Sequence, residues 1–182
     1  TVELAFKNKQ LKEMARTDAL TELANRRAFD EVILHEVARS QRSGKSFVIG
    51  IIDLDRFKPV NDTYGHQMGD TVIKNIAEIL NNSKRHQDLL ARYGGEEFIL
   101  CLPDSTEDDT KLFCERVRNK IAETTFRFGK EQLNVTVSLG GFADIIEQDS
   151  NLSEMTSYAD KALYHSKKSG RNQTTISNNT FK

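Results

Sequence analysis

The sequence has 182 residues, of which 37% are hydrophobic and 29% charged, and this suits one globular domain with a core of its own. Its 26 basic and 27 acidic residues leave a net charge of −1, which argues against nucleic-acid binding, because that function needs a basic excess. No run of about 18 apolar residues occurs. We therefore expect a cytoplasmic domain without membrane contact, although an anchor elsewhere in a longer protein is compatible with this sequence.

Residues 1–16 have a helical composition with irregularly spaced apolar side chains. The chain begins with Thr1 instead of Met, so we expect this segment to be a linker helix that enters from an upstream sensory domain. A frayed terminal helix is the alternative. The rest divides into one domain over 17–178 and a short polar tail over 179–182.

The next apolar spacing predicts an amphipathic helix that ends near Gly44. Residues 47–54 form a nearly continuous β-branched run, which is typical of a central strand buried on both faces. Asp53 lies at the end of that strand, where a carboxylate is costly unless it is paired or bound to a metal ion. A short helical turn and a loop should follow over 59–65, and Gly69 is expected to open the next helix.

A glycine pair, Gly94 and Gly95, separates two apolar strands and predicts a tight hairpin, because glycine tolerates positive φ without steric cost. Backbone N–H groups in such a turn are open to a phosphate. Two carboxylates, Glu96 and Glu97, follow the turn. Because neighbouring residues on a strand point to opposite faces, we expect these two carboxylates to have different roles.

A capped helix is predicted over 106–125, and a last helix over 152–169. The core side of the first should contain Leu112, Phe113, Val117 and Ile121. The inward side of the last should contain Met155, Tyr158, Ala159, Ala162, Leu163 and Tyr164. Residues 133–142 alternate apolar and polar side chains and predict a half-exposed strand, and a short strand follows over 174–177. Strands interleaved with helices around one antiparallel hairpin predict an α+β fold, a central mixed β-sheet flanked by helices.

Two cysteines, Cys101 and Cys114, are expected to pack as small apolar groups without a disulfide. Three histidines, His35, His86 and His165, should face solvent. No spacing of Cys and His residues suggests a zinc site.

Four motifs stand in order along the chain. They are DALTELANRRAF at 18–29, DLDRFKPVNDTYGHQMGD at 53–70, RYGGEEF at 92–98 and ADKALYHSKKSGRN at 159–172. With these motifs the chain resembles the GGDEF domain, the catalytic domain of diguanylate cyclases, in its GGEEF variant. The resemblance implies a nucleotide-cyclase, ferredoxin-like form of the α+β fold.

The resemblance also implies a reaction. A transient antiparallel homodimer would hold one GTP per subunit, and each 3′-hydroxyl would attack the α-phosphate of the other GTP to give cyclic di-GMP and two pyrophosphates. The implied cofactor is Mg²⁺ or Mn²⁺, two ions per active site, which suit oxygen ligands. By position the ligands would be Asp53, Glu96 and the backbone carbonyl of Leu54. Glu97 would either contact these ligands without binding the metal ion itself, or act as general base.

By the same resemblance, Lys167 and Arg171 would bind the β- and γ-phosphates near a helix C-terminus. The backbone N–H groups of Phe57 and Lys58 would join them. For the basic pair alone, a solvated helix end is the alternative interpretation.

Guanine would be recognised by Asn61 and Asp70. The Asn61 amide would bond the purine edge, and the Asp70 carboxylate would accept from the ring N–H and the exocyclic amine. Adenine lacks both of these donors, so the site would select guanine. Gly94 and Gly95 would let the phosphates approach the backbone. His66 lies inside the second motif, among the substrate-binding residues, and we expect it first of all to stabilise the loop.

An Arg85-x-x-Asp88 pair shortly before the hairpin matches the inhibitory product site of the family. Arg85 would grip a phosphate or guanine edge of cyclic di-GMP, and Asp88 would accept from guanine. Arg116 would add a contact from a neighbouring subunit.

Two other functions remain open. The first is a catalytically silent module that binds GTP or cyclic di-GMP, but the retained metal carboxylates and phosphate-binding cations favour the enzyme. The second is another cyclase or polymerase-like nucleotidyl transferase, which shares the metal chemistry. The guanine-reading pair counts against it.

Overall fold

A six-stranded mixed sheet forms the middle layer of the structure, a computed structural model that describes residues 1–145 and 151–178. Side by side, its strands are β1 (Ala24–Asn25), β3 (Leu89–Arg92), β4 (Glu97–Pro103), β2 (Ser46–Leu54), β7 (Val137–Ile145) and β8 (Thr174–Ser177). The outer pairs, β1 with β3 and β7 with β8, are parallel, and the inner pairs are antiparallel. The central mixed sheet is thus confirmed.

The four inner strands have the connectivity of a ferredoxin-like fold. The helices α3 (Phe57–Tyr64) and α4 (His66–Ser83) follow β2, the β3–β4 hairpin comes next, and α5 (Glu107–Glu123) leads towards β7. This is a βαββαβ unit with the spatial order β3-β4-β2-β7. The arrangement brings the β3–β4 turn beside the end of β2.

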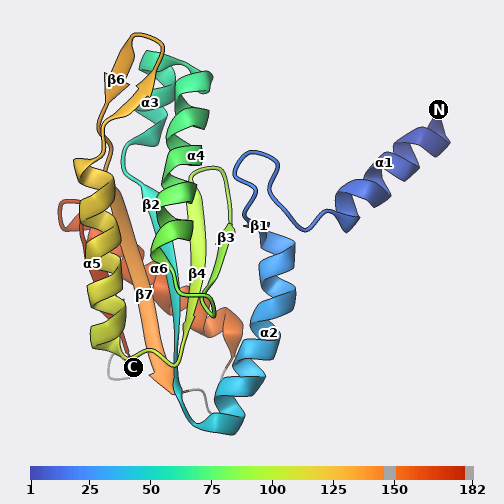
Figure 1. Ribbon diagram of the computed structural model, residues 1–182. Helices are drawn as coiled ribbons and strands as arrows, with labels where there is room; N and C mark the ends of the chain where they lie inside the picture. Colours follow the sequence, from blue (N-terminus) through green and yellow to red (C-terminus); the bar gives the residue numbers. More distant parts are fainter. Residues whose placement is uncertain (146–150, 179–182) are drawn as a thin grey trace.

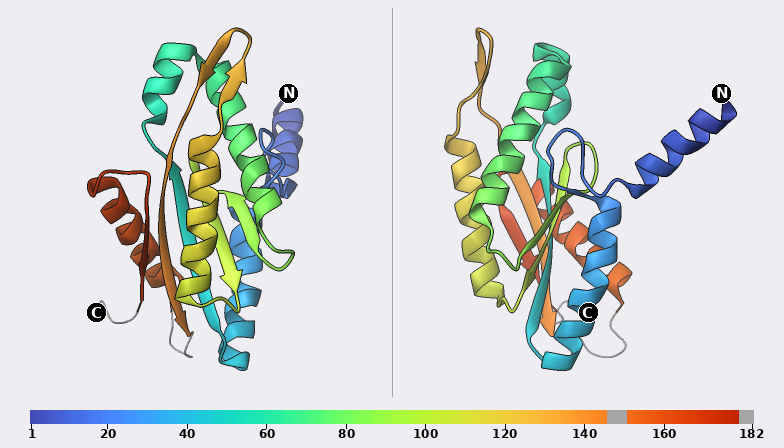
Figure 2. Two further views of the ribbon diagram at one scale, coloured as in Figure 1. Left: turned by 60° about the vertical axis from the view of Figure 1, so that its left-hand side comes forward. Right: turned by 45° about the vertical axis from the view of Figure 1, so that its right-hand side comes forward.

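Helices cover both faces of the sheet (Figure 1). Helices α3, α4 and α5 pack on one face, and α2 (Arg26–Ser43) and α6 (Leu152–Lys168) pack on the other, as the right-hand view of Figure 2 shows. Because side chains alternate along a strand, Val48 and Ile52 of β2 join the core under α4 and α5, whereas Ile49 and Ile51 join the core under α2 and α6. Both faces of β2 are therefore buried in a hydrophobic core, which explains the continuous apolar run in this strand.

Two segments lie outside this three-layer body. Helix α1 (Val2–Met14) extends away from the sheet (Figure 1), and its Leu4 and Phe6 side chains are exposed. A two-stranded hairpin, β5 (Phe126–Phe128) with β6 (Glu131–Leu133), precedes β7 and was not predicted. Within the described ranges, no helix has the length and apolar character that crossing a bilayer requires.

The prediction of a half-exposed strand over 133–142 was wrong. Strand β7 is buried from Val137 to Ala143, because it lies between β2 and β8 and under α6. Its alternating polar residues face inward: Thr136, just before the strand, and Ser138 donate to the Asp55 carboxylate at 2.7 and 2.6 Å. The polar alternation therefore satisfies a buried charge instead of facing water.

Several local expectations also need correction. Leu112 and Tyr164 are 70% and 62% exposed and do not belong to the core. Helix α4 begins at His66, so Gly69 is inside it. Neither glycine of the hairpin, Gly94 or Gly95, has a positive φ, so backbone freedom is not what requires them.

The predictions for the cysteines and for three histidines are confirmed. Cys101 and Cys114 are buried free thiols, and burial raises the pKa of Cys114 to about 12. His35, His86 and His165 are exposed.

Candidate active site

The candidate site lies where β2 ends beside the β3–β4 turn. Asp53 of β2 is directly opposite Glu97 of β4 in the strand register. The next residue, Leu54, donates its N–H to the Glu96 carbonyl at 3.3 Å, which continues the pairing to the turn. The three carboxylates predicted from separate motifs are thus brought to one edge of the sheet.

Lys167, from the last turn of α6, enters this group of carboxylates. Its Nζ lies 2.6 Å from Asp53 Oδ2, and the Asp53 side chain is only 7% exposed. The other oxygen, Asp53 Oδ1, is buried without a hydrogen-bond partner. An unpartnered buried carboxylate oxygen is costly in a protein and is the type of atom that a cation would satisfy.

The carboxylates at this edge have raised pKa values. Burial raises the pKa of Asp53, and the Lys167 ammonium opposes that rise. Burial and then the charge of Asp53 raise the pKa values of Glu96 and Glu97. Three acidic groups beside one cation form an electrostatically unfavourable arrangement, which is typical of functional sites and is relieved by bound cations.

This donor set fits a hard divalent cation. Asp53, Glu96 and the Leu54 carbonyl offer oxygen atoms, which Mg²⁺ and Mn²⁺ prefer. Across the described ranges no three His, Cys, Asp or Glu side chains are arranged to hold a metal ion by themselves. Magnesium sites in nucleotide enzymes commonly use one or two carboxylates and complete their shell with water and phosphate oxygens, so two carboxylates are sufficient.

The space around Gly94 and Gly95 explains why the hairpin carries glycine at these two positions. A Cβ on Gly94 would lie 3.2 Å from Glu97 Oε2, so glycine leaves room for that carboxylate. A Cβ on Gly95 would meet no atom within 4 Å, so the backbone there is open to an approaching ligand. Tyr93 and Gly94 donate their N–H groups to the Glu97 carbonyl, which closes the turn.

The second predicted phosphate ligand, Arg171, lies in an unusual turn after α6. Gly170, Arg171 and Asn172 all have positive φ, at 117°, 65° and 46°. The Asn172 N–H donates to Asp55 Oδ2 at 3.0 Å. The Arg171 guanidinium is exposed and makes no hydrogen bond or ion pair with another residue in the described ranges, so it is available to an anion.

The predicted guanine-reading residues come from α3 and α4. Asn61 is half-buried and Asp70 is exposed. A Cβ on Gly69 would lie 1.9 Å from Asn61 Oδ1, so the amide rests directly on the α4 backbone at this glycine. Close helix packing, not a helix start, is therefore the reason for Gly69.

Three other predicted residues lie at helix starts. Phe57 and Lys58 begin α3, whose first-turn N–H groups have no acceptors within the helix. Phe57 is buried and Lys58 is exposed. His66 is exposed at the start of α4, and its side chain makes no hydrogen bond with another described residue, which gives no support to a loop-stabilising role.

Arg85, Asp88 and Arg116 line one pocket of about 250 Å³ on the α5 side of the sheet. Arg85 and Asp88 form an ion pair at 3.1 Å, and the Arg85 N–H donates to the same carboxylate at 2.8 Å. Arg116 donates to the Ser83 carbonyl at 3.0 Å. The three residues are therefore brought together, with the Asp88 carboxylate already engaged by Arg85.

Some connecting residues were not predicted from the sequence. Arg92 bonds both oxygens of Asp18 at 3.1 and 3.2 Å and also the Gly95 carbonyl at 2.7 Å, so it ties the first motif to the hairpin. Arg26 stacks over the Tyr93 ring at 4.4 Å. All four side chains lie inside the recognised motifs, but sequence spacing alone does not show which of them touch.

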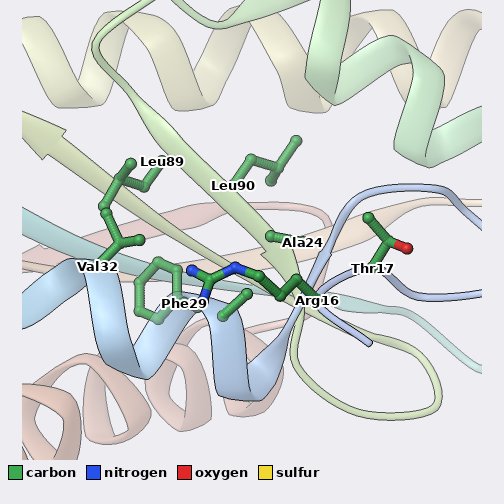
Figure 3. Close-up of a pocket in the computed structure, with 8 residues that line it drawn as sticks. Arg16, Thr17, Ala24, Phe29, Val32, Leu89 and Leu90 are labelled. Carbon is green, nitrogen blue, oxygen red and sulfur yellow. The ribbon is translucent and has the colours of Figure 1, made fainter. Parts of the chain in front are cut away.

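A second pocket, of about 230 Å³, lies between α2 and β3 (Figure 3). Phe29, Val32, Leu89 and Leu90 supply apolar walls, and Arg16 lies beside Phe29. Arg16 is paired with Glu31. This mainly apolar pocket lacks the free cations that a triphosphate needs, so the β2 end is the better candidate for a nucleotide site.

A comparison with known protein families decides the assignment. The family model described as "Diguanylate cyclase, GGDEF domain" matches residues 15–173. The chain belongs to the GGDEF family. This confirms the resemblance inferred from the four motifs.

Curated GGDEF relatives carry the name diguanylate cyclase. Diguanylate cyclase A of Treponema denticola is 37% identical over 98% of this chain and 48% of its own length. Diguanylate cyclase DgcP of Pseudomonas aeruginosa is 40% identical over 89% of this chain and 24% of its own length. The chain thus spans half or less of the length of these relatives.

Solved GGDEF structures have the same fold. The GGDEF domain of DgcB from Caulobacter crescentus, in complex with c-di-GMP, superposes with a TM-score of 0.84 at 34% identity, over 89% of this chain and 95% of that chain. The diguanylate cyclase SiaD from Pseudomonas aeruginosa, in complex with its activator SiaC, gives a TM-score of 0.85 at 40% identity, over 96% and 66%. The α+β fold with a mixed sheet is thereby established.

Proposed function

We propose that this chain is an active diguanylate cyclase domain that condenses two GTP molecules into cyclic di-GMP and two pyrophosphates. The observation that carries the proposal is the group of Asp53, Glu96 and Glu97 at one sheet edge, with the Lys167 ammonium 2.6 Å from Asp53. The named relatives support the same activity. The homodimer, the site residues and the product inhibition are part of this proposal.

Asp53, Glu96 and the Leu54 carbonyl would hold the divalent ions, which we propose to be two Mg²⁺ or Mn²⁺ per active site. Bound ions of this kind neutralise the triphosphate and make a hydroxyl more acidic. Unpartnered Asp53 Oδ1 is the atom that favours this assignment. Glu97, whose pKa is raised by burial, is our candidate to take the proton of the attacking 3′-hydroxyl.

The phosphates would be bound by fixed cations and backbone donors. Lys167 and Arg171 would stabilise the negative charge that develops on the leaving pyrophosphate. The first-turn N–H groups of Phe57 and Lys58 have no helical acceptor and would add neutral donors. These groups lie at the ends of helices that pack on opposite faces of the sheet, and both ends face the edge where β2 stops.

Guanine would bind between α3 and α4. Asn61 rests against Gly69 and would bond the purine edge, and Asp70 would accept from the two donors that adenine lacks. His66, exposed at the start of α4, would lie beside the base. Discrimination against ATP follows because adenine would leave Asp70 without its donors.

Two chains are needed for one product. One site of this kind holds one GTP, so the second GTP must be presented by a second copy of the domain, in a transient antiparallel homodimer. An upstream sensory domain would control that encounter. The pocket with Arg85, Asp88 and Arg116 would bind cyclic di-GMP as inhibitor. On binding, the Asp88 carboxylate would give up its ion pair with Arg85 and accept hydrogen bonds from guanine instead.

The test is GTP turnover with Mg²⁺ over a wide range of protein concentrations, with nucleotides separated by chromatography. We expect cyclic di-GMP to form with more than first-order dependence on protein, and to disappear in Glu96→Gln. Glu131→Gln, at an exposed position in β6, is the matched control and should retain the activity.

If GTP stays intact at the highest protein concentration, in a sample free of bound product, the proposed cyclase activity is wrong. If the same sample still binds GTP or cyclic di-GMP, the domain is a catalytically silent binding module. A linear dependence on protein concentration would overturn the homodimer alone.

A further inference from the structure

Arg118 of α5 belongs to none of the four motifs, yet it contacts the turn that carries Arg171. Its Nη1 donates to Asn172 Oδ1 at 2.9 Å. Its side chain is only 16% exposed. A guanidinium buried to this extent is costly unless it is paired and hydrogen-bonded, and one of its bonds here reaches a residue 54 positions away.

Glu115, three residues earlier on α5, orients the Arg118 guanidinium. Arg118 Nε lies 3.1 Å from both Glu115 oxygens, and Nη2 lies 2.7 Å from Oε2. Such a two-point pair fixes the guanidinium plane. The hydrogen bond from Arg118 lowers the pKa of Glu115, so the pair stays charged at neutral pH. The remaining Nη1 is thereby aimed at Asn172.

The turn that receives this bond is strained. Arg171 and Asn172 both lie in the left-handed region, which is unfavourable for residues with a Cβ and is tolerated best by Asn. Such a backbone persists only where its surroundings hold it. Asn172 is held twice, by Asp55 on its N–H and by Arg118 on its side chain.

The same turn decides where the Arg171 side chain leaves the backbone. Asp55, which anchors it, follows Asp53 by two residues at the end of β2, so the turn is tied to the strand that carries the proposed metal ligand. The Arg171 guanidinium itself has no partner among the described residues. Its placement therefore depends on the backbone and on the residues that hold it.

We propose that Arg118, acting through the Asn172 side chain, is a positioning residue that holds Arg171 ready for the terminal phosphates of GTP. This inference rests on the proposed function, because it assumes that Arg171 binds those phosphates. Pre-positioning lowers the entropic cost of binding, since the guanidinium need not be ordered by the ligand.

Binding of 3′-deoxy-GTP with Mg²⁺, measured by calorimetry, tests the proposal without turnover, because this ligand lacks the attacking hydroxyl. GMP, which lacks the β- and γ-phosphates, is the matched ligand. The variants are Arg118→Ala and Asn172→Gly; the glycine removes the side-chain bond but accepts the left-handed backbone, so the fold is retained. Lys120→Ala, an exposed cation of the same helix, is the control.

We expect each variant to weaken 3′-deoxy-GTP binding by roughly fivefold to tenfold and to leave GMP binding unchanged, as for coupled residues in one network. In an Arg171→Ala background, neither variant should weaken binding further. Lys120→Ala should bind both ligands as the unmodified chain does.

Three results would overturn the inference while the proposed function stands: normal 3′-deoxy-GTP binding in both variants, equal losses for GMP and 3′-deoxy-GTP, or a full additional loss in the Arg171→Ala background. The last two would assign Arg118 a purely structural role. Failure of the unmodified chain to bind 3′-deoxy-GTP would instead overturn the proposed function, and the inference with it.

Discussion

Lys167 Nζ and Asp53 Oδ2 lie 2.6 Å apart, although the two residues are 114 positions apart in the chain. The pair joins the last turn of α6 to the end of β2, and it places a cation beside a buried carboxylate whose second oxygen has no partner. The ammonium offsets part of the cost of burying Asp53 and remains near the position proposed for the phosphates.

Replacing Lys167 tests this relationship. Lys167→Met should lower GTP affinity and turnover by roughly tenfold or more, because a hydrogen bond to a charged group contributes about 1.5–3 kcal/mol. Steady-state kinetics and binding of 3′-deoxy-GTP would measure both losses. Lys168→Met, at the next and exposed position, is the control and should change neither quantity by more than about twofold. Equal losses in both variants would mean that the helix end acts only through its overall charge.

Adding one methyl group should disturb the guanine site. A Cβ on Gly69 would lie 1.9 Å from Asn61 Oδ1, and since that atom ends a flexible side chain, it is the amide that must move. Gly69→Ala should therefore weaken GTP binding by roughly tenfold and reduce the preference for GTP over ATP, at little cost to folding. Competition binding with the two nucleotides would measure this. In an Asn61→Ala background the same change should have a much smaller effect, and an undiminished effect would exclude the amide as its cause.

A different glycine should matter for stability. A Cβ on Gly140 would lie 2.1 Å from the Leu163 nitrogen and 2.5 Å from the Ala159 carbonyl oxygen, both backbone atoms of α6 that cannot move alone. Gly140→Ala should lower the free energy of unfolding by about 3 kcal/mol. Urea denaturation would measure it. Gly95→Ala, where a Cβ meets no atom within 4 Å, should stay within about 0.5 kcal/mol of the parent, and equal losses would contradict the steric argument.

Acid stability should depend on the Asp18–Arg92 pair. Burial alone would raise the pKa of Asp18, but the hydrogen bonds from Thr21 and Arg92 outweigh it and lower that pKa. A carboxylate with a lowered folded-state pKa stabilises the protein above its unfolded value of about 3.9, and this contribution is lost as the pH falls through the folded value.

The free energy of unfolding should therefore fall between about pH 5 and pH 3, in part through Asp18. Asp18→Asn should be less stable at pH 6 by about 1–2 kcal/mol and should show a shallower loss on acidification. Urea unfolding at a series of pH values gives both numbers. Parallel curves for the two proteins, at any offset, would show that Asp18 has the same pKa in the folded and unfolded chains.

The order of elements was readable from the sequence because each depends on local periodicity. The helix ending at Gly44, the buried run of β2 and the capped α5 follow from residues close together in the chain. The expectations that failed depended on distant neighbours. Leu112 has a helical core spacing but is left exposed by the described part of the chain, and the polar residues before and in β7 contact Asp55 instead of water.

Contiguous motifs and patterns of period two and 3.6 were sufficient to predict the family, the α+β class and the residue types at the candidate site. Which side chains contact one another became known only from the folded chain. Asp53 pairs with Lys167, Arg92 with Asp18, and Arg118 with Asn172, each across more than fifty positions. The physical reason is that sheet register and helix packing bring these atoms together, and both are set by burial of the whole core, which no local stretch of sequence contains.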